Sequence, residues 1–260
     1  MSVNLLSVES LSLEQLRNVL IRLEDSIIFA FAERAQFKTN ETIYKPGAIH
    51  FKDGYEGSFF DWFLHEVESV HAKVRRYQSP DEYPFTKKLP EPVLVPLDYA
   101  DIINKNDKVN INDQIKAVYL DIVVPSMCEA GDDSNYGSSA TCDITCLQNL
   151  SRRIHYGKFV AESKFSDPVY HDKYVELIKA KDRDGLMQLL TNEKVEKLLL
   201  ERLKRKAENY GQEFEGIGNI SGGSQSPSVR TNPDLVVQIY KDYVIPLTKE
   251  VEVLYLLNRI

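Results

Sequence analysis

Residues 150–165 read Leu-Ser-Arg-Arg-Ile-His-Tyr-Gly-Lys-Phe-Val-Ala-Glu-Ser-Lys-Phe, and this stretch is the most informative in the chain. Arg153 and Lys164 are eleven residues apart with Gly157 between them, so all three lie along one face of a predicted helix. At ~1.5 Å per residue, the two cations are roughly 16 Å apart along the axis. We predict that their long side chains lean toward each other over Gly157. They would then form a cationic recess, which suits a small anion with more than one carboxylate.

A solvated basic face would show the same periodicity, and on these residues alone that alternative stays open. Gly157 favours the recess, because a glycine inside a helix costs ~1 kcal/mol relative to alanine and often has a spatial reason. The whole stretch belongs to a predicted helix over residues 140–166.

The chain on either side of this helix also shows helical patterning. Ser12 and Gln15 form a capping-box pattern, and apolar residues then recur at three- and four-residue steps, which predicts a helix to about Arg34. Pro233 suits the first turn of a last helix that runs to the C-terminus, and Pro246 should kink that helix or follow a short break. The other predicted helices cover residues 58–78, 113–125, 169–180, 182–190 and 191–210.

Two segments are predicted to lack regular structure. Residues 79–98 hold five of the eleven prolines, which favours an extended surface connection. Residues 211–232 hold five of the twelve glycines and several serines, which favours a loop. We find no strand pattern, hairpin turn or internal repeat. The sequence therefore predicts one all-α domain over residues 1–260, a helical bundle of about ten to twelve helices.

Composition excludes several classes of protein. The formal net charge is −7 with both signs interspersed, whereas a nucleic-acid-binding protein should show a basic face or stripe. No apolar run approaches the ~18 residues of a membrane span, and the N-terminus lacks the pattern of a signal peptide. The odd number of cysteines then indicates reduced thiols and a cytoplasmic location. The three cysteines are Cys128, Cys142 and Cys146.

Motifs of common catalytic sites are absent from the sequence. There is no Walker loop, no glycine-rich dinucleotide motif after a strand, no HExxH and no nucleophile elbow. Cys142 and Cys146 are one helical turn apart, but no His or Cys pair lies at a spacing that would complete a zinc site. If the protein is an enzyme, we expect its reaction to need no nucleophile, metal or cofactor.

Two predicted helices carry one-turn polar pairs within apolar faces, namely Asn192 with Glu196, and Thr248 with Glu252. Glu252 lies in a helix that should be largely buried, where a carboxyl either pairs with a cation or keeps its proton. A purely structural ion pair with Lys249, Arg259 or another helix is the alternative for this residue.

Three long segments resemble fungal chorismate mutases. They are residues 17–29 (Arg-x₄-Arg-x-Glu-Asp-Ser-Ile-Ile-Phe), residues 151–165, and residues 245–253 (Ile-Pro-Leu-Thr-Lys-Glu-Val-Glu-Val), and the resemblance extends over about residues 12–259. It implies an all-helical, homodimeric, allosteric enzyme. The reaction implied is the rearrangement of chorismate to prephenate in phenylalanine and tyrosine biosynthesis.

The resemblance also implies the roles of individual residues. Arg17, Arg153 and Lys164 match the cations that hold the chorismate dianion. Lys164 also matches the donor to the ether oxygen of the substrate, and Glu252 matches the carboxylic acid that faces this oxygen. These matches make Arg153, Lys164 and Glu252 the predicted catalytic residues.

Substrate contacts are implied for three more positions. Asn192 and Thr248 match side chains that contact the substrate carboxylates, and Glu196 matches the acceptor for the ring hydroxyl. In this reaction the protein need only select the folded conformer and stabilise charge as the C–O bond breaks, so no cofactor is implied.

Regulation at the dimer interface is implied too, with tryptophan as activator and tyrosine as inhibitor. Arg75 and Arg76 match the pair that grips the effector, although a helix dipole alone accounts for two arginines at a predicted helix C-terminus. The segment that receives the effector from the partner subunit is matched by Asn135, Gly137 and Ser138. Two positions depart from the family pattern, since Cys142 stands where an arginine is common and Asn232 where a threonine is usual.

Two functions without catalysis also fit parts of the sequence. One is a helical interaction protein, in which Arg153 and Lys164 belong to a solvated face. The other is a helical sensor that binds an aromatic amino acid through Arg75 and Arg76. Neither function requires a buried acid such as Glu252, whereas the enzyme does.

Overall fold

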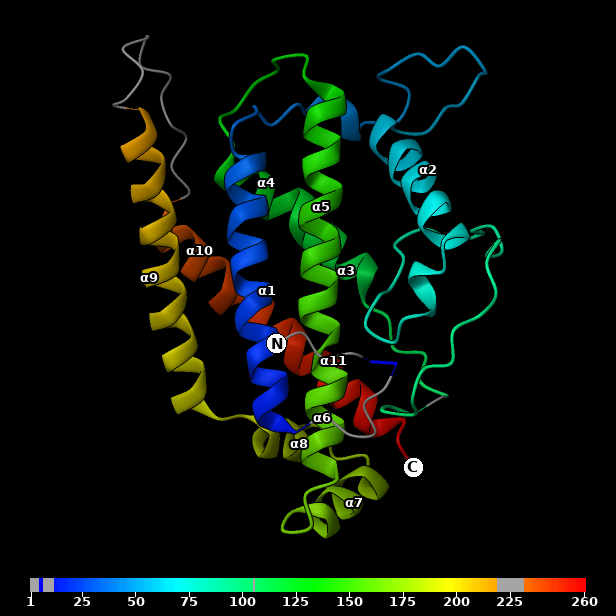
Figure 1. Ribbon diagram of the computed structural model, residues 1–260, viewed down its shortest axis with the longest axis vertical. Helices are drawn as coiled ribbons and strands as arrows, with labels where there is room; N and C mark the ends of the chain where they lie inside the picture. Colours follow the sequence, from blue (N-terminus) through cyan, green and yellow to red (C-terminus); the bar gives the residue numbers. More distant parts are fainter. Residues whose placement is uncertain (1–4, 7–11, 105, 219–231) are drawn as a thin grey trace.

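The structure is a computed structural model that describes residues 5–6, 12–104, 106–218 and 232–260. Within these ranges every regular element is a helix and none is a strand, which confirms the predicted all-α class (Figure 1). The α-helices are α1 (Leu13–Arg34), α2 (Phe59–Lys73), α3 (Asn112–Val118), α4 (Val124–Met127), α5 (Tyr136–His155), α6 (Gly157–Phe165), α7 (His171–Ala180), α8 (Arg183–Leu190), α9 (Glu193–Gly218), α10 (Pro233–Ile239) and α11 (Ile245–Leu257).

Several of these elements join end to end. A π turn at Tyr119–Val123 connects α3 with α4, another at Tyr240–Val244 connects α10 with α11, and α6 follows α5 after one residue. The eleven α-helical elements of the described ranges therefore form eight continuous helices, which is fewer than the predicted number. Short 3₁₀ turns at Glu41–Tyr44 and Arg76–Gln78 complete the regular structure of these ranges.

Helices α1 and α5 lie side by side through the middle of the molecule, with α9 on one flank and α2 on the other (Figure 1). Helix α1 begins and ends as predicted, and its capping box is present: Ser12 Oγ accepts from Gln15 N–H at 3.2 Å, and Gln15 Oε1 accepts from Ser12 N–H at 2.9 Å. Helices α6, α7 and α8 form the end of the molecule that is lowest in the figure. No helix in the described ranges is long and apolar enough to cross a membrane.

Two prolines lie in helices that continue past them. The helix predicted to stop near Pro125 ends at Met127, and Pro246 follows a π turn through which the helix continues, so it does not follow a break. A proline ring clashes with the carbonyl four residues earlier, and the wider π turn relieves this clash. The two turns share a pattern that sequence analysis missed, Tyr-x-Asp-x-Val followed by Val-Pro at residues 119–125 and by Ile-Pro at residues 240–246.

The start of α5 and the end of α2 also differ from the prediction. The helix predicted over residues 140–166 begins earlier, at Tyr136, and is divided at Tyr156 into α5 and α6. Helix α2 ends at Lys73 rather than at residue 78, because Arg75 adopts a left-handed conformation with φ of 70°. Residues 79–98 contain neither helix nor strand, as predicted.

Helix α9 is longer than predicted. It follows Asn192, whose Oδ1 accepts from Val195 N–H at 3.2 Å, and it extends to Gly218. Residues 211–218 of the predicted loop are thus helical, because a helix that is already nucleated tolerates interior glycines at ~1 kcal/mol each. The remaining loop residues, 219–231, lie outside the described ranges. Asn232, where the resemblance expects threonine, caps α10, and Pro233 lies in its first turn as predicted.

Three clusters of buried apolar side chains hold the helices together. The largest lies between α1, α2, α5, α9 and the two π turns, the second joins α6, α7, α8 and α11, and the third joins the start of α1 to the start of α6. One leucine represents each cluster here. Leu199 packs against the first cluster, Leu190 belongs to the second, and Leu16 belongs to the third. All three also line the cavity described below, so the cavity lies where the clusters meet.

Gly157 marks a close approach of α6 to α11. A Cβ atom at this position would lie 2.8 Å from the backbone oxygen of Thr248 and 3.2 Å from Cγ of Glu252. These separations are shorter than ordinary van der Waals contacts, so α11 can occupy its place only because residue 157 has no side chain. The prediction that Gly157 has a spatial reason is therefore confirmed. The reason is the close packing of two helices and not a recess above the glycine.

We predict that Gly157→Ala forces α6 and α11 apart, because the nearest contacted atom is backbone and cannot rotate away. Overpacking of this kind costs about 1–3 kcal/mol, so thermal unfolding should begin at a lower temperature. Gly137→Ala is the matched control, since nothing lies within 4 Å of a Cβ added in the exposed first turn of α5. That variant should be neutral, or more stable by up to about 1 kcal/mol. Equal melting temperatures for the two variants would contradict the packing argument.

Candidate active site

One cavity collects all seven residues that the resemblance assigns to the substrate site. Its volume is about 260 Å³, and it lies between the N-terminal half of α1, the α5–α6 segment, the α8–α9 junction and α11. The seven residues among its lining are Arg17, Arg153, Lys164, Asn192, Glu196, Thr248 and Glu252. Much of the remaining lining is aliphatic, which lowers the local dielectric and strengthens the interactions of the charged groups.

Lys164 and Glu252 meet across the α6–α11 contact. Lys164 Nζ donates to Glu252 Oε2 at 3.2 Å and to the backbone oxygen of Leu190 at 2.8 Å. Glu252 is only 6% exposed, and this burial raises the pKa of its carboxyl above the ordinary value even though Lys164 opposes the shift. The cation beside Glu252 is therefore Lys164, on another helix. Lys249 and Arg259, the two partners named as alternatives, pair with other carboxylates.

Arg153 is a buried cation with unused hydrogen-bonding capacity. It is 3% exposed, and its Nη1 donates to Thr248 Oγ1 at a long 3.4 Å. Its buried Nε has no hydrogen-bond partner among the described residues. Arg17 is exposed at the mouth of the cavity and has no ion-pair partner in the described part of the chain. Two guanidinium groups are thus available for an anion in the cavity.

One charged residue of the cavity was not among the predicted site residues. Lys249 lines it, and its Nζ lies 2.6 Å from Oε1 of Glu196. The signal was present in the sequence, because Ile245, Thr248, Lys249 and Glu252 follow at i, i+3, i+4 and i+7 and so share one face of α11. Gly157, by contrast, does not line the cavity. The recess predicted over this glycine lies beside it, since α11 fills the space above it.

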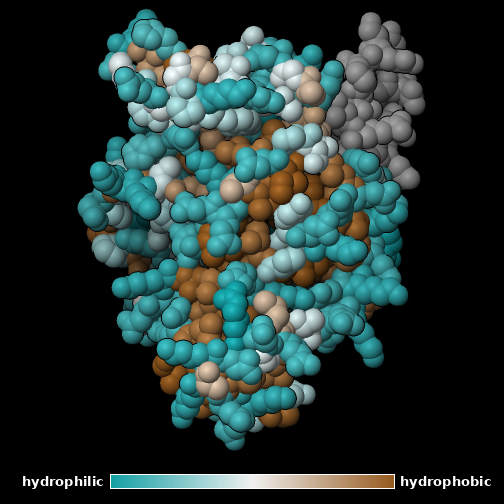
Figure 2. All heavy atoms as spheres, turned by 180° about the vertical axis from the view of Figure 1, so that it is seen from behind, coloured by the Kyte–Doolittle hydropathy of each residue, from teal (hydrophilic) through white to brown (hydrophobic). Residues whose placement is uncertain are grey.

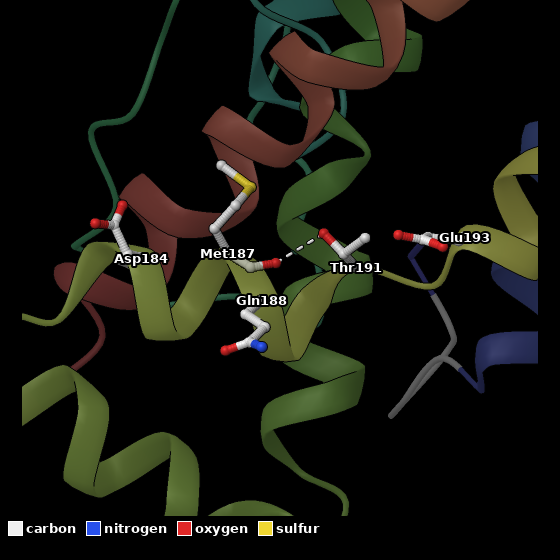
Figure 3. Close-up of a pocket in the computed structure, with 5 residues that line it drawn as sticks. All are labelled: Asp184, Met187, Gln188, Thr191 and Glu193. Carbon is white, nitrogen blue, oxygen red and sulfur yellow. Dashed lines mark hydrogen bonds between the residues drawn. The ribbon is translucent and has the colours of Figure 1, made fainter.

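A second, open pocket lies on the outer side of the α8–α9 junction. Its lining side chains do not converge, and Figure 3 shows Asp184, Gln188 and Glu193 pointing in different directions. Thr191 Oγ1 donates to the backbone oxygen of Met187 at 2.8 Å, which closes the last turn of α8 (Figure 3). This turn fixes the residues on either side of Thr191, which both line the main cavity. The turn at Thr191 therefore supports the main cavity from the outer side.

The residues predicted to hold an effector lie away from this cavity. Arg76 contacts Glu82 at 3.0 Å and Gln148 at 2.9 Å, and Arg75 donates to the backbone oxygen of Val95. Both arginines directly follow Val74, the C-cap of α2, and Arg75 N–H donates to the backbone oxygen of Ala72 at 2.9 Å. Their position at a helix C-terminus agrees with the helix-dipole explanation. Asn135, Gly137 and Ser138 lie at the start of α5, about 15–20 Å along the axis from Gln148. One chain does not bring the two groups together.

The cysteines considered as metal ligands lie within α5. Cys146 is buried in the core and Cys142 is partly buried. The described part of the chain contains no cluster of three or more His, Cys, Asp and Glu side chains that could hold a metal ion. An all-helical fold with a largely aliphatic cavity, in which arginines and a lysine surround a desolvated carboxyl, is typical of an enzyme that acts on a small anionic substrate.

Comparisons with known proteins identify the family. The profile of chorismate mutase type II matches residues 135–253. The chain is 49% identical over 260 residues to the chorismate mutase of Schizosaccharomyces pombe, covering 97% of this chain and 98% of that protein. Its structure is similar to a Candida albicans chorismate mutase in complex with L-Trp, with a TM-score of 0.85, 40% identity and coverage of 95% and 91% of the two chains. It is also similar to AtCM1 with tyrosine bound in its allosteric site, with a TM-score of 0.84, 45% identity and coverage of 97% and 98%.

The chain therefore belongs to the type II chorismate mutase family and is an isomerase.

Proposed function

We propose that the cavity between α1, α5, α6, α9 and α11 binds chorismate as a dianion and rearranges it to prephenate. One observation carries the proposal: the Lys164 ammonium lies 3.2 Å from the desolvated Glu252 carboxyl, in a cavity that also holds two arginines. The reaction forms a C–C bond and breaks a C–O bond within one molecule. It needs no nucleophile and no leaving group, and this chain's site offers charge and shape alone.

Arg17 and Arg153 anchor the two carboxylates of the substrate in this proposal, and Asn192 and Thr248 complete these contacts. Anchoring both ends selects the folded conformer in which the reacting carbons are adjacent, so the entropy of folding the substrate is lost on binding rather than in the reaction step. Glu196 uses one oxygen for Lys249, and a carboxylate can accept a further donor. Glu196 therefore accepts the ring hydroxyl of chorismate.

Lys164 and Glu252 act where negative charge develops. The raised pKa of Glu252 favours its protonated form, which donates a hydrogen bond to the ether oxygen as the C–O bond breaks. Lys164 donates to the same oxygen from α6. Preorganised donors of this kind are each worth about 3 kcal/mol in the transition state, by comparison with the deletion of one oxyanion-hole donor.

We also propose that the protein is a homodimer of one domain, residues 1–260, that works in the cytoplasm, where its three free thiols stay reduced. Tryptophan activates it and tyrosine inhibits it, each held by Arg75 and Arg76 of one subunit and the start of α5 of the other. Relatives solved with L-Trp, and with tyrosine in an allosteric site, support this regulation. The separation of the two residue groups within one chain supports a site shared between subunits.

A spectrophotometric assay tests the proposed activity and separates it from a non-catalytic helical sensor or interaction protein. The protein should catalyse the conversion of chorismate, which is measured as the loss of chorismate absorbance. The rate should be higher with tryptophan and lower with tyrosine. Binding of either amino acid without any turnover would favour the sensor and contradict the enzyme. Turnover at a rate that neither amino acid changes would support the proposed activity and contradict the proposed regulation.

The role of Glu252 predicts a particular pH dependence. Only the protonated carboxyl donates, so kcat should fall as pH rises through the raised pKa of Glu252. The amide of Glu252→Gln donates at every pH. When kcat is measured from neutral to alkaline pH, the alkaline limb of this variant's profile should therefore be flatter than that of the native protein. Glu193→Gln, an exposed change outside the cavity, is the control and should keep the native profile. A Glu252→Gln profile that superimposes on the native one would refute the assignment.

A further inference from the structure

Glu162 lies on α6, two residues before Lys164, and is held by the C-terminal end of the chain. Its Oε2 accepts from Arg259 Nε at 2.7 Å, and its Oε1 accepts from Arg259 Nη2 at 2.9 Å. The hydroxyl of Tyr255, on α11, also donates to Oε2 and itself accepts from Asn104 N–H at 3.0 Å. Both carboxylate oxygens are thus engaged, and the arginine contact is bidentate, the geometry that best fixes orientation.

Arg259 makes a second contact with α6. Its guanidinium lies over the ring of Phe165, 5.2 Å from the centroid, which is within the range of a cation–π interaction. Arg259 follows the end of α11 at Leu257, and its N–H donates to the backbone oxygen of Leu256 at 3.0 Å. The side chain therefore links the end of α11 to both Glu162 and the last residue of α6.

Helix α6 is nine residues long and continues from α5 through Tyr156, whose backbone oxygen accepts from Val160 N–H at 3.2 Å. Its apolar side chains pack in the second and third clusters, and Glu162 adds a polar contact near its C-terminal end. Its first residue, Gly157, packs against the middle of α11, which fixes one end. The other end carries Lys164, whose ammonium spans to α8 and α11. A lysine side chain is flexible, so a rigid contact near this end helps to hold the ammonium at a defined place.

Two contacts between α6 and α11 therefore lie one helical turn apart on α11. Tyr255 follows Glu252 by three residues, so the contact of Glu162 with Tyr255 is next to the contact of Lys164 with Glu252. We propose that Glu162 is a positioning residue for the rearrangement, which sets the separation of the Lys164 ammonium and the Glu252 carboxyl by clamping Tyr255 and Arg259. This role rests on the proposed function of Lys164 and Glu252, and Glu162 itself does not line the cavity.

A clamp with this role has a consequence for the titration of Glu252. The charged and titratable groups that face Glu252 are Lys164 on α6, Arg153 on α5, Lys249 on α11 and Tyr174 on α7, with Glu196 on α9 paired to Lys249. Lys164 is the strongest of the groups that lower the pKa of Glu252. If the clamp is loosened and the ammonium moves away, this opposing effect weakens and the pKa of Glu252 rises further.

Glu162→Gln tests the proposal, since the amide keeps the size of the side chain and loses the bidentate ion pair. We expect kcat with chorismate to fall about tenfold, because both donors must meet one oxygen. The alkaline limb of the kcat profile should move to higher pH, while KM changes little because the arginines that anchor the substrate are untouched. A merely structural role of Glu162 would lower the melting temperature without moving this limb.

Glu250→Gln is the matched control. Glu250 also lies on α11 and pairs with an arginine, Arg183 of α8, but this pair is away from the cavity. The control should keep the native kcat and pH profile. If Glu162→Gln does not fold, Arg259→Lys, which keeps the charge and loses the two-pronged contact, should show the same displacement of the limb to a smaller extent.

Three results would overturn the clamp. The first is a folded Glu162→Gln variant whose kcat and pH profile equal those of the native protein. The second is an Arg259→Lys variant with the native kcat and pH profile. The third is that Glu162→Gln and Glu250→Gln change kcat and the pH profile equally. Failure of the clamp is distinguishable from failure of the proposed function, because the unmodified protein then still turns over chorismate and Glu252→Gln still flattens the alkaline limb. A native protein without turnover would instead contradict the proposed function.

Discussion

The close packing of α6 against α11 at Gly157 is the constraint on which the rest of the site depends. A Cβ at this position would lie 2.8 Å from the backbone oxygen of Thr248, so the distance between the helices is set by the absence of a side chain. The same two helices carry Lys164 and Glu252. The separation of the two groups is therefore fixed by backbone packing, which is stiff, and not only by the long side chain of a lysine. Interiors packed to this density transmit small displacements, and a shift of either helix would reach the site directly.

Burial and charge act in opposite directions on Glu252. Removal from water raises the pKa of the carboxyl, and the nearby Lys164, Arg153 and Lys249 lower it. The direction of the result is upward, because desolvation in the aliphatic cavity outweighs the three cations. A site with more cations, or with more water, would hold Glu252 as a carboxylate that could accept but not donate. The aliphatic residues around the cavity thus favour the protonated form of the acid, which the proposed rearrangement uses.

The sequence predicted those parts of the structure that rest on local signals. The capping box at Ser12, the first-turn proline at residue 233 and the spacing of Arg153 and Lys164 all depend on neighbours within a few turns of helix. The structure shows the capping box and the proline in place, and both cations line one cavity. The π turns were missed, because Pro125 and Pro246 signal a break whereas a widened turn lets the helix continue. The contact of Glu162 with Arg259 joins residues 97 apart in the chain, and no periodicity can reveal such a pair. Recognition of the substrate-site residues came from the resemblance, since spacing alone left a solvated face open.

The central claim is that Glu252 is a protonated acid beside Lys164 at neutral pH. Infrared difference spectroscopy between the native protein and Glu252→Gln, recorded over a pH series, measures this state directly. The account predicts a carbonyl stretch of a protonated carboxyl in the native protein at neutral pH, which is lost only as the pH rises through the raised pKa. A difference spectrum that shows only carboxylate bands at neutral pH would contradict the account.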